Sequence, residues 1–405
     1  MQTEPEVGEP SFLEELIQAE PQHPTHKSKD EFKPWHKPRK HWIRRNQWQA
    51  EALILIGELG LAQKQRPLSY VSLPGPDLLD VRSMHQVCVE NGVKLQFLGF
   101  MTGTKDDETE LNLSYDEVMS LPNVVRESSV VVDAIQSLAD RASVGFSRIE
   151  GSTSFDVVNI DLCNSIAGAP PESDKAYYDA LQQLIDSQRR RRPPNEPWIL
   201  FLTTRANSGA INQQAKERFL DCLLANVRDH EDVRQAILEA LDLSEQAIGD
   251  FRNAGAAGPG FEKAFAVAVS KWLLQLMGTG APTGTIELLP SSCVYGVSQP
   301  GGMDMLSLGF IFRMNIAPPV DGAGLAAAAQ NAHPIPSEPE AACNVIRRVP
   351  DMKNVDDVLR SDPGTYDTVA ADAAEFMRYA RFDYDKYMEQ AAKWPEAPVK
   401  SAAVV

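Results

Sequence analysis

Short apolar runs alternate with segments of helical periodicity through the middle of the chain, and this alternation constrains the fold more than any other feature. Each run is too short for a buried helix, and each gap is long enough for a crossover. Parallel strands covered on both faces read as nearly continuous apolar runs. We therefore predict an α/β domain with a largely parallel sheet. Its expected strands are 68–73, 95–100, 130–132, 155–163 and 198–203.

Helical periodicity fills most segments between these strands. One helix should start near Trp48, because the apolar residues that follow share a face, and Gly60 is suited to end it. Asp133 follows the third strand and is suited to cap a helix there. The expected helices are 48–59, 80–90, the segment after Asp133, and 177–185.

Two further apolar runs, 286–297 and 306–312, flank a Pro300-Gly301-Gly302 turn signal. The sheet is therefore predicted to finish with a C-terminal antiparallel hairpin. Composition shifts divide the chain around this domain. Residues 1–45 are expected to be an extended, proline-punctuated arm, 46–315 the α/β domain, 316–350 a linker or strap rich in Ala, Pro and Gly, and 351–405 two short helices with a tail.

Charge is distributed unevenly along the chain. The formal net charge is −17, which opposes general affinity for nucleic acid, yet residues 26–48 carry +6 together with three tryptophans. Cations could neutralise phosphates while indoles stack on bases. Alternatively, the tryptophans pack on the domain and the cations pair with its acidic surface. The candidate nucleic-acid contacts are Lys37, Arg39, Lys40, Arg44 and Arg45, and a second basic run spans 189–192.

Cysteine usage and the N-terminal sequence bear on the compartment. Five widely spaced cysteines form no CxxC pair, so buried free thiols are expected, Cys163 among them. The acidic start of the chain lacks a basic segment followed by an apolar one, and no apolar run approaches the length of a membrane span. We expect a cytoplasmic protein without membrane contact.

Three carboxylates are placed to meet at one edge of the predicted sheet. Asp161 ends the fourth strand, and Asp77 and Asp80 follow the first. Open α/β sheets bind ligands at the carboxyl ends of their strands, so Asp161 is the candidate catalytic residue. A structural role, capping or anchoring the next loop, is the alternative for Asp161. A metal-dependent hydrolase using the three carboxylates is a third interpretation.

Five alternating strands and helices closed by a hairpin resemble the class I S-adenosylmethionine-dependent methyltransferase fold over about 270 residues. The resemblance implies a Rossmann-like sheet in which Gly75 and Asp77 lie in the turn after the first strand. It further implies that Asp133 lies on the adenine side of the cofactor, and that Asp161 ends the substrate-facing strand with Cys163 and Asn164. Asp80 would belong to the same cofactor crevice.

The sequence departs from that family where the cofactor would bind. Pro74 and Pro76 flank the single glycine of the first turn and remove two amide donors. The second strand runs into LGFMTG, without the ribose-binding acid. We therefore expect no bound cofactor, with S-adenosylmethionine as the alternative, and a non-catalytic or weakly catalytic subunit rather than an active methyltransferase with an atypical pocket.

The segments FKPWHKPRKHWIRRNQW, LPGPDLLDVR and DVVNIDLC also resemble a family of uncharacterised bacterial proteins associated with mobile or defence gene clusters. This resemblance implies a bacterial cytoplasmic protein that works in a multiprotein system, with partner proteins from the same operon and nucleic acid as a further partner through the arm.

Overall fold

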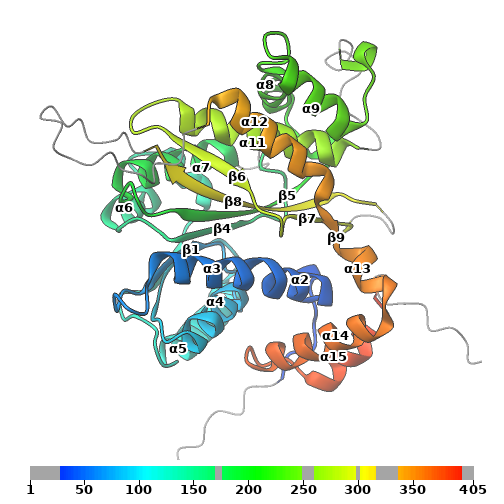
Figure 1. Cartoon of the computed structure of the whole chain (residues 1–405). Helices are drawn as coiled ribbons and strands as arrows, with labels where there is room; N and C mark the ends of the chain where they lie inside the picture. Colours follow the sequence, from blue (N-terminus) through cyan, green and yellow to red (C-terminus); the bar gives the residue numbers. More distant parts are fainter. Residues whose placement is uncertain (1–27, 169–175, 249–259, 298–301, 316–335, 395–405) are drawn as a thin grey trace, which may run out of the picture.

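A computed structural model of the chain describes residues 28–168, 176–248, 260–297, 302–315 and 336–394. One mixed sheet runs through the molecule, with helices packed on both of its faces (Figure 1). The arrangement confirms the predicted α/β class.

The sheet order is β3-β2-β1-β4-β5-β8-β7-β9, and β6 pairs with β8 beside this path. The first five strands in sequence are parallel neighbours, while β8 runs antiparallel to β5, β6 and β7. Such a 3-2-1-4-5 order is that of doubly wound, Rossmann-like sheets, and it reverses between β1 and β4. The strands are β1 Leu68–Ser72, β2 Leu95–Met101, β3 Ser129–Val132, β4 Val157–Asp161, β5 Trp198–Arg205, β6 Gly284–Leu288, β7 Cys293–Tyr295, β8 Met305–Met314 and β9 Lys353–Asn354.

The predicted antiparallel hairpin is confirmed in outline but is more elaborate. The run expected at 286–297 divides into β6 and β7, and both pair with β8, along different parts of its length. The turn signal at Pro300-Gly301-Gly302 lies largely outside the described residues.

Alternating residues of each strand pack into two separate hydrophobic cores, one on each face of the sheet. On β5, Trp198, Leu200 and Leu202 belong to the core above the sheet in Figure 1, whereas Ile199 and Phe201 belong to the core below it. The upper layer contains α7 Tyr177–Arg191, α8 Gln213–Leu224, α9 Glu231–Leu241, α11 Phe261–Gly278 and α12 Glu338–Arg348, with the shorter α6 Val144–Gly151 at one end. The lower layer contains α3 Ala50–Leu59, α4 Leu79–Glu90, α5 Lys105–Met119 and the terminal helices.

The N-terminal segment is helical where an extended arm was expected. From Pro38 the chain forms α2 Pro38–Ile43, the π-helical turn η2 Arg44–Gln49 and then α3, which ends at Gly60 with φ 61° as predicted. Pro34 starts the short 3₁₀ helix η1 Pro34–His36, and Pro38 starts α2. Each proline therefore occupies a first helical position, where its missing N–H is not needed. Only the part before Pro34 is extended among the described residues, and residues 1–27 lie outside them.

The C-terminal region contains more helix than expected. α12 occupies part of the predicted linker, and a capping box between Ser337 and Glu340 starts it. α13 Val355–Ser361 corresponds to the first predicted helix. The second divides into α14 Pro363–Arg378 and α15 Tyr384–Ala391, because the chain turns at Arg381 with φ 67°.

Most of the cysteines in the described residues are buried. Cys88, Cys222, Cys293 and Cys343 are buried free thiols, as expected, but Cys163 is exposed, so its prediction was wrong. It lies just after β4, where the chain leaves the sheet. No helix in the described part of the chain has the length and apolarity to cross a membrane.

Candidate functional site

The carboxyl edge of the parallel strands holds the candidate site, and a side chain from the N-terminal segment fills its centre. Asp161 ends β4, and its Oδ1 accepts a hydrogen bond of 2.6 Å from Nζ of Lys40 on α2. The same Nζ lies 3.3 Å from Oγ1 of Thr203, the register partner of Asp161 on β5, and 4.7 Å from the Trp48 ring centroid. Lys40 is only 3% exposed. An ammonium group of this chain therefore sits against the central strands where a ligand would be expected.

Asp80, predicted to share the crevice, is buried beneath this pair. Its Oδ2 accepts a hydrogen bond of 2.9 Å from the Tyr70 hydroxyl, and its Oδ1 accepts one of 2.8 Å from the amide of Val81. The Tyr70 oxygen in turn accepts a hydrogen bond from Asn159 on β4. Burial raises the pKa of Asp80, and the nearby charge of Asp161 raises it further.

A second cation, Arg44, is enclosed beside these carboxylates. Its guanidinium donates a hydrogen bond of 2.9 Å to the backbone oxygen of Trp35. Burial lowers the pKa of Arg44, while the charges of Asp161 and Asp80 oppose that shift. His41 on the same segment is buried against Phe376, and burial with the adjacent arginine charge lowers its pKa to about 3. His41 is therefore neutral at ordinary pH.

The π-helical turn η2 fastens this segment to the antiparallel end of the sheet. Gln47 donates hydrogen bonds to the backbone oxygens of Ser307 and Ser291, and it accepts one of 2.6 Å from the Ser307 hydroxyl. Arg39 pairs at 3.3 Å with Asp356 on α13, whose other oxygen accepts the amide of Gly296. The cations over the crevice are thus held by contacts to the sheet and to the C-terminal helices.

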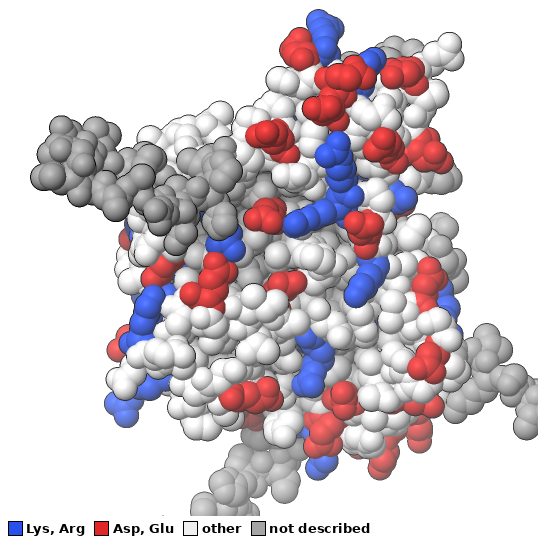
Figure 2. Space-filling view, viewed as in Figure 1, with Lys and Arg blue, Asp and Glu red and all other residues white. Residues whose placement is uncertain are grey.

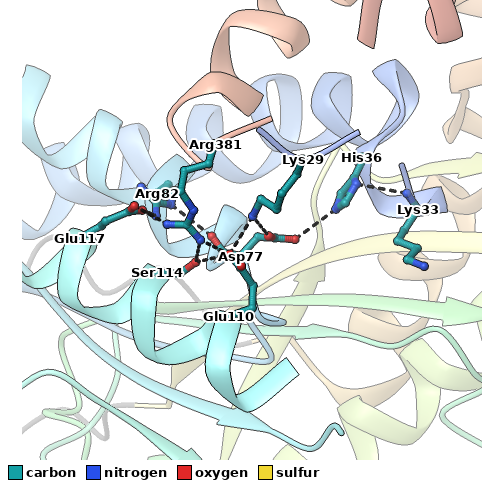
Figure 3. A network of polar contacts seen from close by, with 9 residues as sticks. All are labelled: Lys29, Lys33, His36, Asp77, Arg82, Glu110, Ser114, Glu117 and Arg381. Carbon is teal, nitrogen blue, oxygen red and sulfur yellow. Dashed lines mark hydrogen bonds and ion pairs between the residues drawn. The ribbon is translucent and has the colours of Figure 1, made fainter. Parts of the chain in front are cut away.

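Asp77 belongs to a separate polar network that joins both terminal segments to the domain (Figure 3). Lys29 lies 2.5 Å from Asp77 and 2.8 Å from Glu110 on α5. Arg381 pairs with Glu110 and Glu117 of the same helix. Arg82 of α4 also reaches Glu117, at 2.6 Å.

His36 completes this network from the other side of Asp77. The amide of Lys33 donates to Nδ1 of His36, so the ring proton lies on Nε2, 3.3 Å from Oδ2 of Asp77. Burial alone would raise the pKa of Asp77, but the His36 contact and the charge of Lys29 bring it below its usual value. Asp77 and Asp80 therefore have opposite pKa shifts although they lie three residues apart.

The other two predicted cofactor residues do not join the buried cluster. Gly75 has φ 62° in the turn after β1, and the preceding Pro74 packs so closely on β2 that a Cβ at Gly99 would lie 2.9 Å from its Cγ. Asp133 follows β3, is half-buried, and accepts a hydrogen bond of 2.8 Å from the next amide, Ala134. It does not cap the short 3₁₀ helix Ile135–Ala139 that follows.

The five candidate nucleic-acid contacts divide between interior and surface. Arg39, Lys40 and Arg44 are buried in the pairs described above, which removes them from the reach of an external phosphate. Lys37 is half-buried and Arg45 is exposed. The tryptophans pack on the domain, since Trp42 and Trp48 are buried. Blue and red side chains are interspersed over the face drawn in Figure 2, without a continuous positive strip among its described residues.

The second basic run lies at the opposite end of the sheet and does not extend the arm. Arg192 is buried and pairs at 2.7 Å with Asp156, which immediately precedes β4, whereas Asp161 ends that strand. Arg190 and Arg191 both pair with Glu150 on α6. These arginines hold the amino end of the sheet to its flanking helices.

A metal-dependent hydrolase finds no support in this geometry. Within the ranges that the structure describes, no three His, Cys, Asp or Glu side chains are grouped so as to hold a metal ion. Asp77 is engaged by Lys29 and His36, Asp161 by Lys40 and Asp80 by Tyr70, so the three predicted carboxylates face separate partners.

Comparison with known proteins places the chain in a family. The model of the PP_RS20740-like family matches residues 29–392, and the chain belongs to that family. No curated protein matches it.

Several solved structures match the chain at low sequence identity. They include an O-methyltransferase family protein from Burkholderia thailandensis, 10% identical with a TM-score of 0.28, covering 67% of this chain and 57% of that one. An SAH-bound methyltransferase of Podospora anserina is 9% identical with a TM-score of 0.29, covering 69% and 88%. An O-methyltransferase of Streptomyces achromogenes in complex with SAM is 9% identical with a TM-score of 0.28, covering 69% and 89%. The Rossmann-like sheet is established by the strand order itself.

Proposed function

We propose that this member of the PP_RS20740-like family is a non-catalytic or weakly catalytic, methyltransferase-like subunit of a bacterial multiprotein system, and that it acts by binding a partner. The observation that carries the proposal is the ion pair of 2.6 Å between Lys40 and Asp161. A cofactor with a positively charged sulfonium would have to displace a buried ammonium that already satisfies the carboxylate at the end of β4. Displacement would leave the Lys40 ammonium buried without its anion, which is strongly unfavourable.

The loop after β1 supports the same conclusion. A glycine-rich turn binds a ligand through its free backbone amides, but here two prolines lack the N–H and Pro74 is packed on β2. Asp77, the acid of that turn, is engaged by Lys29 and His36. Two amide donors of this turn are therefore missing, and its acid is already paired within the protein.

A partner protein is favoured over nucleic acid. Arg39, Lys40 and Arg44 are buried, so Lys37 and Arg45 are the two of the five candidate cations that remain near the surface. Two phosphate contacts give little affinity at physiological salt. The resemblance to a family associated with mobile or defence gene clusters suggests that the partner is encoded by a neighbouring gene.

Calorimetric titration of the full chain with S-adenosylmethionine tests the non-catalytic role. We expect no saturable binding to the wild type or to the control Lys37→Met, which removes a cation outside the crevice. Binding in the low micromolar range that is abolished by Asp133→Ala would overturn the proposal and establish the alternative, an active methyltransferase with an atypical pocket.

Co-expression with each neighbouring gene, followed by purification of a stoichiometric complex, tests the partner. Nucleic-acid binding is measured separately with single- and double-stranded DNA and RNA at two salt concentrations. Tight, salt-sensitive binding that is lost in Lys37→Gln/Arg45→Gln would replace the protein partner with nucleic acid.

A further inference from the structure

Strand β3 forms an open, uncharged edge of the sheet. It ends the strand order, and among the described residues β2 is the strand that pairs with it. Its sequence, SVVV, contains no charged residue and no proline, and Val132 is 55% exposed. At the other end of the strand order, β9 is two residues long and carries Lys353. Proteins usually shorten, charge or cover an edge strand, because its open backbone groups invite another strand.

The backbone of β3 presents two residues to its outer side. On β2, Leu95 turns both its N–H and its C=O toward the β3 side of the sheet. Backbone direction alternates along a strand, so Gly99 does the same and bonds the residues on either side of its register partner, Val130. The N–H and C=O groups of Val130 and Val132 therefore point outward. No hydrogen-bond partner for these groups occurs in the part of the chain that the structure describes.

The open stretch is limited on both sides. Ser128, before it, donates its amide within the preceding turn, and its oxygen accepts a hydrogen bond of 2.8 Å from the Tyr115 hydroxyl. After it, the amide of Asp133 donates back into β3 at 3.0 Å. An added strand can therefore bond the two outward valines and little beyond them.

Apolar side chains flank these backbone groups on both faces of the sheet. Val130 packs against the core below the sheet, and Val131 against the core above it. Val132 follows Val130 on the lower face. Near the edge on the upper face, Val144 is 62% exposed where α6 begins, next to the part of that helix that packs on Phe100. The edge therefore suits a partner strand that is itself apolar.

We propose that β3 pairs antiparallel with β3 of a second copy of this chain, about a two-fold axis at Val131. A two-fold interface needs a self-complementary surface. With Val131 opposite its counterpart, Val130 of each copy lies opposite Val132 of the other. Both outward residues then form hydrogen-bonded pairs, two pairs with two bonds each, and valine packs beside valine. Asp133 falls opposite Ser129, so the pairing brings no like charges face to face.

The two adjacent two-fold positions fit less well. An axis at Val130 would place Val132 opposite Ser128, whose backbone groups are engaged. An axis at Val132 would place Val130 opposite Ala134, which lies beyond the end of the strand. A standard interface buries about 800 Å² on each partner. An edge as short as β3 contributes less, so we expect a reversible dimer with a Kd on the order of micromolar or weaker.

Disulfide cross-linking of the full chain in a glutathione buffer tests the register. Val131 and its counterpart form a non-hydrogen-bonded pair with Cα atoms about 4.5 Å apart, within the range of about 4.4–6.8 Å that a disulfide spans. Val131→Cys should therefore cross-link into a dimer. Val132→Cys is the matched control, because its side chain is more exposed but its own counterpart lies diagonally across the pair, at about 7–8 Å. The wild type reports the background from the exposed Cys163.

Sedimentation velocity over a series of protein concentrations tests the association itself. Val132→Lys should raise the Kd by about tenfold or more, because a charge would be placed between valines. Val132→Thr keeps the branched shape and the N–H and should dimerise like the wild type, as should Val89→Lys, the same substitution at an exposed valine on α4. Raising the ionic strength from about 0.1 to 1 M should strengthen the dimer, because salt screens the repulsion between two chains of net charge −17.

Three results would overturn the proposal. One is a wild type that stays monomeric at every concentration and at both ionic strengths. Another is a Val132→Cys protein that cross-links as fast as Val131→Cys, since random collisions favour the more exposed thiol. The third is unchanged association of a Val132→Lys variant whose melting temperature matches the wild type. The pairing does not rest on the proposed function, because neither the S-adenosylmethionine titration nor the partner search involves β3.

Discussion

Replacing Lys40 by methionine removes the charge in the crevice while keeping a long apolar side chain. Lys40 donates to Asp161 and Thr203 and lies over the Trp48 ring, so the substitution leaves Asp161 without its cation in a largely enclosed position. The reverse substitution, Asp161→Asn, leaves the buried ammonium without its anion. If the pair is a structural lock on the crevice, each variant should be markedly less stable than the wild type.

The expected magnitude follows from burial. Removing one partner of a buried ion pair costs about 3–5 kcal/mol. The Asp161 side chain is 20% exposed and the Lys40 side chain 4%. Water can therefore reach the orphaned carboxylate, and we expect Lys40→Met to cost about 3 kcal/mol, at the lower end of that range. The double variant should cost little more than either single one, because no unpaired charge remains, which gives a coupling of about 2–3 kcal/mol.

Urea unfolding of the four proteins at neutral pH, followed by tryptophan fluorescence, measures this coupling. Trp48 lies beside the pair, so its emission also reports local loosening. Ser361→Ala on α13 serves as a surface control. Two results would refute a stabilising role of the ion pair. One is a loss of less than about 0.5 kcal/mol in each single variant, the usual range for surface changes. The other is a double variant in which the two losses simply add.

The two neighbouring carboxylates should respond to pH in opposite ways. Burial raises the folded-state pKa of Asp80. The stability that Asp80 contributes is therefore fully present below the ordinary carboxyl pKa and is lost as the pH rises. Relative to the wild type, Asp80→Asn should gain stability in unfolding titrations as the pH increases from 4 to 7, roughly the window above the pKa of an unperturbed Asp. The pKa of Asp77 is lowered, so its contribution is present above the ordinary value and is lost as pH falls, and Asp77→Asn should destabilise most at neutral pH. Gly99→Ala should lower stability by about 1–3 kcal/mol because the new Cβ would meet Pro74 at 2.9 Å, whereas Gly57→Ala, with open space around it in α3, should raise it by up to about 1 kcal/mol in the same assay.

The sequence predicted the sheet well because strand identity is a local property. Apolar runs such as 198–203 are visible within a few residues, and their separation by helical segments restricts the connections between them. The N-terminal helices were missed because Pro34 and Pro38 were interpreted as interruptions, although proline is also favoured at the first helical position. Similarly, the Ser337 to Glu340 capping box was the local signal of α12 within an otherwise linker-like composition.

The site was harder to predict, because its partners are far apart in sequence. Asp161 was identified from its strand-end position alone, which fixes where the carboxylate lies but not what it faces. Lys40 reaches it from 121 residues away, and Arg381 reaches Glu110 across 271 residues. Pairings of this kind depend on how the two terminal segments pack against the domain, and neither periodicity nor turn chemistry encodes that packing.

The charge of the N-terminal segment nevertheless limited what its cations could do. A segment of net charge +6 in a chain of net charge −17 must either be neutralised by its own fold or remain available to an external anion. The tryptophans favour neutralisation within the fold, because burying Trp42 and Trp48 also buries Arg44 between them. A buried charge without a nearby opposite charge is strongly unfavourable. Asp161 at the end of β4 and Asp80 in the first turn of α4 are the acids whose charges act on Arg44 there. The carboxylates that first suggested a catalytic crevice therefore also provide the negative charge that allows the arm to fold into it.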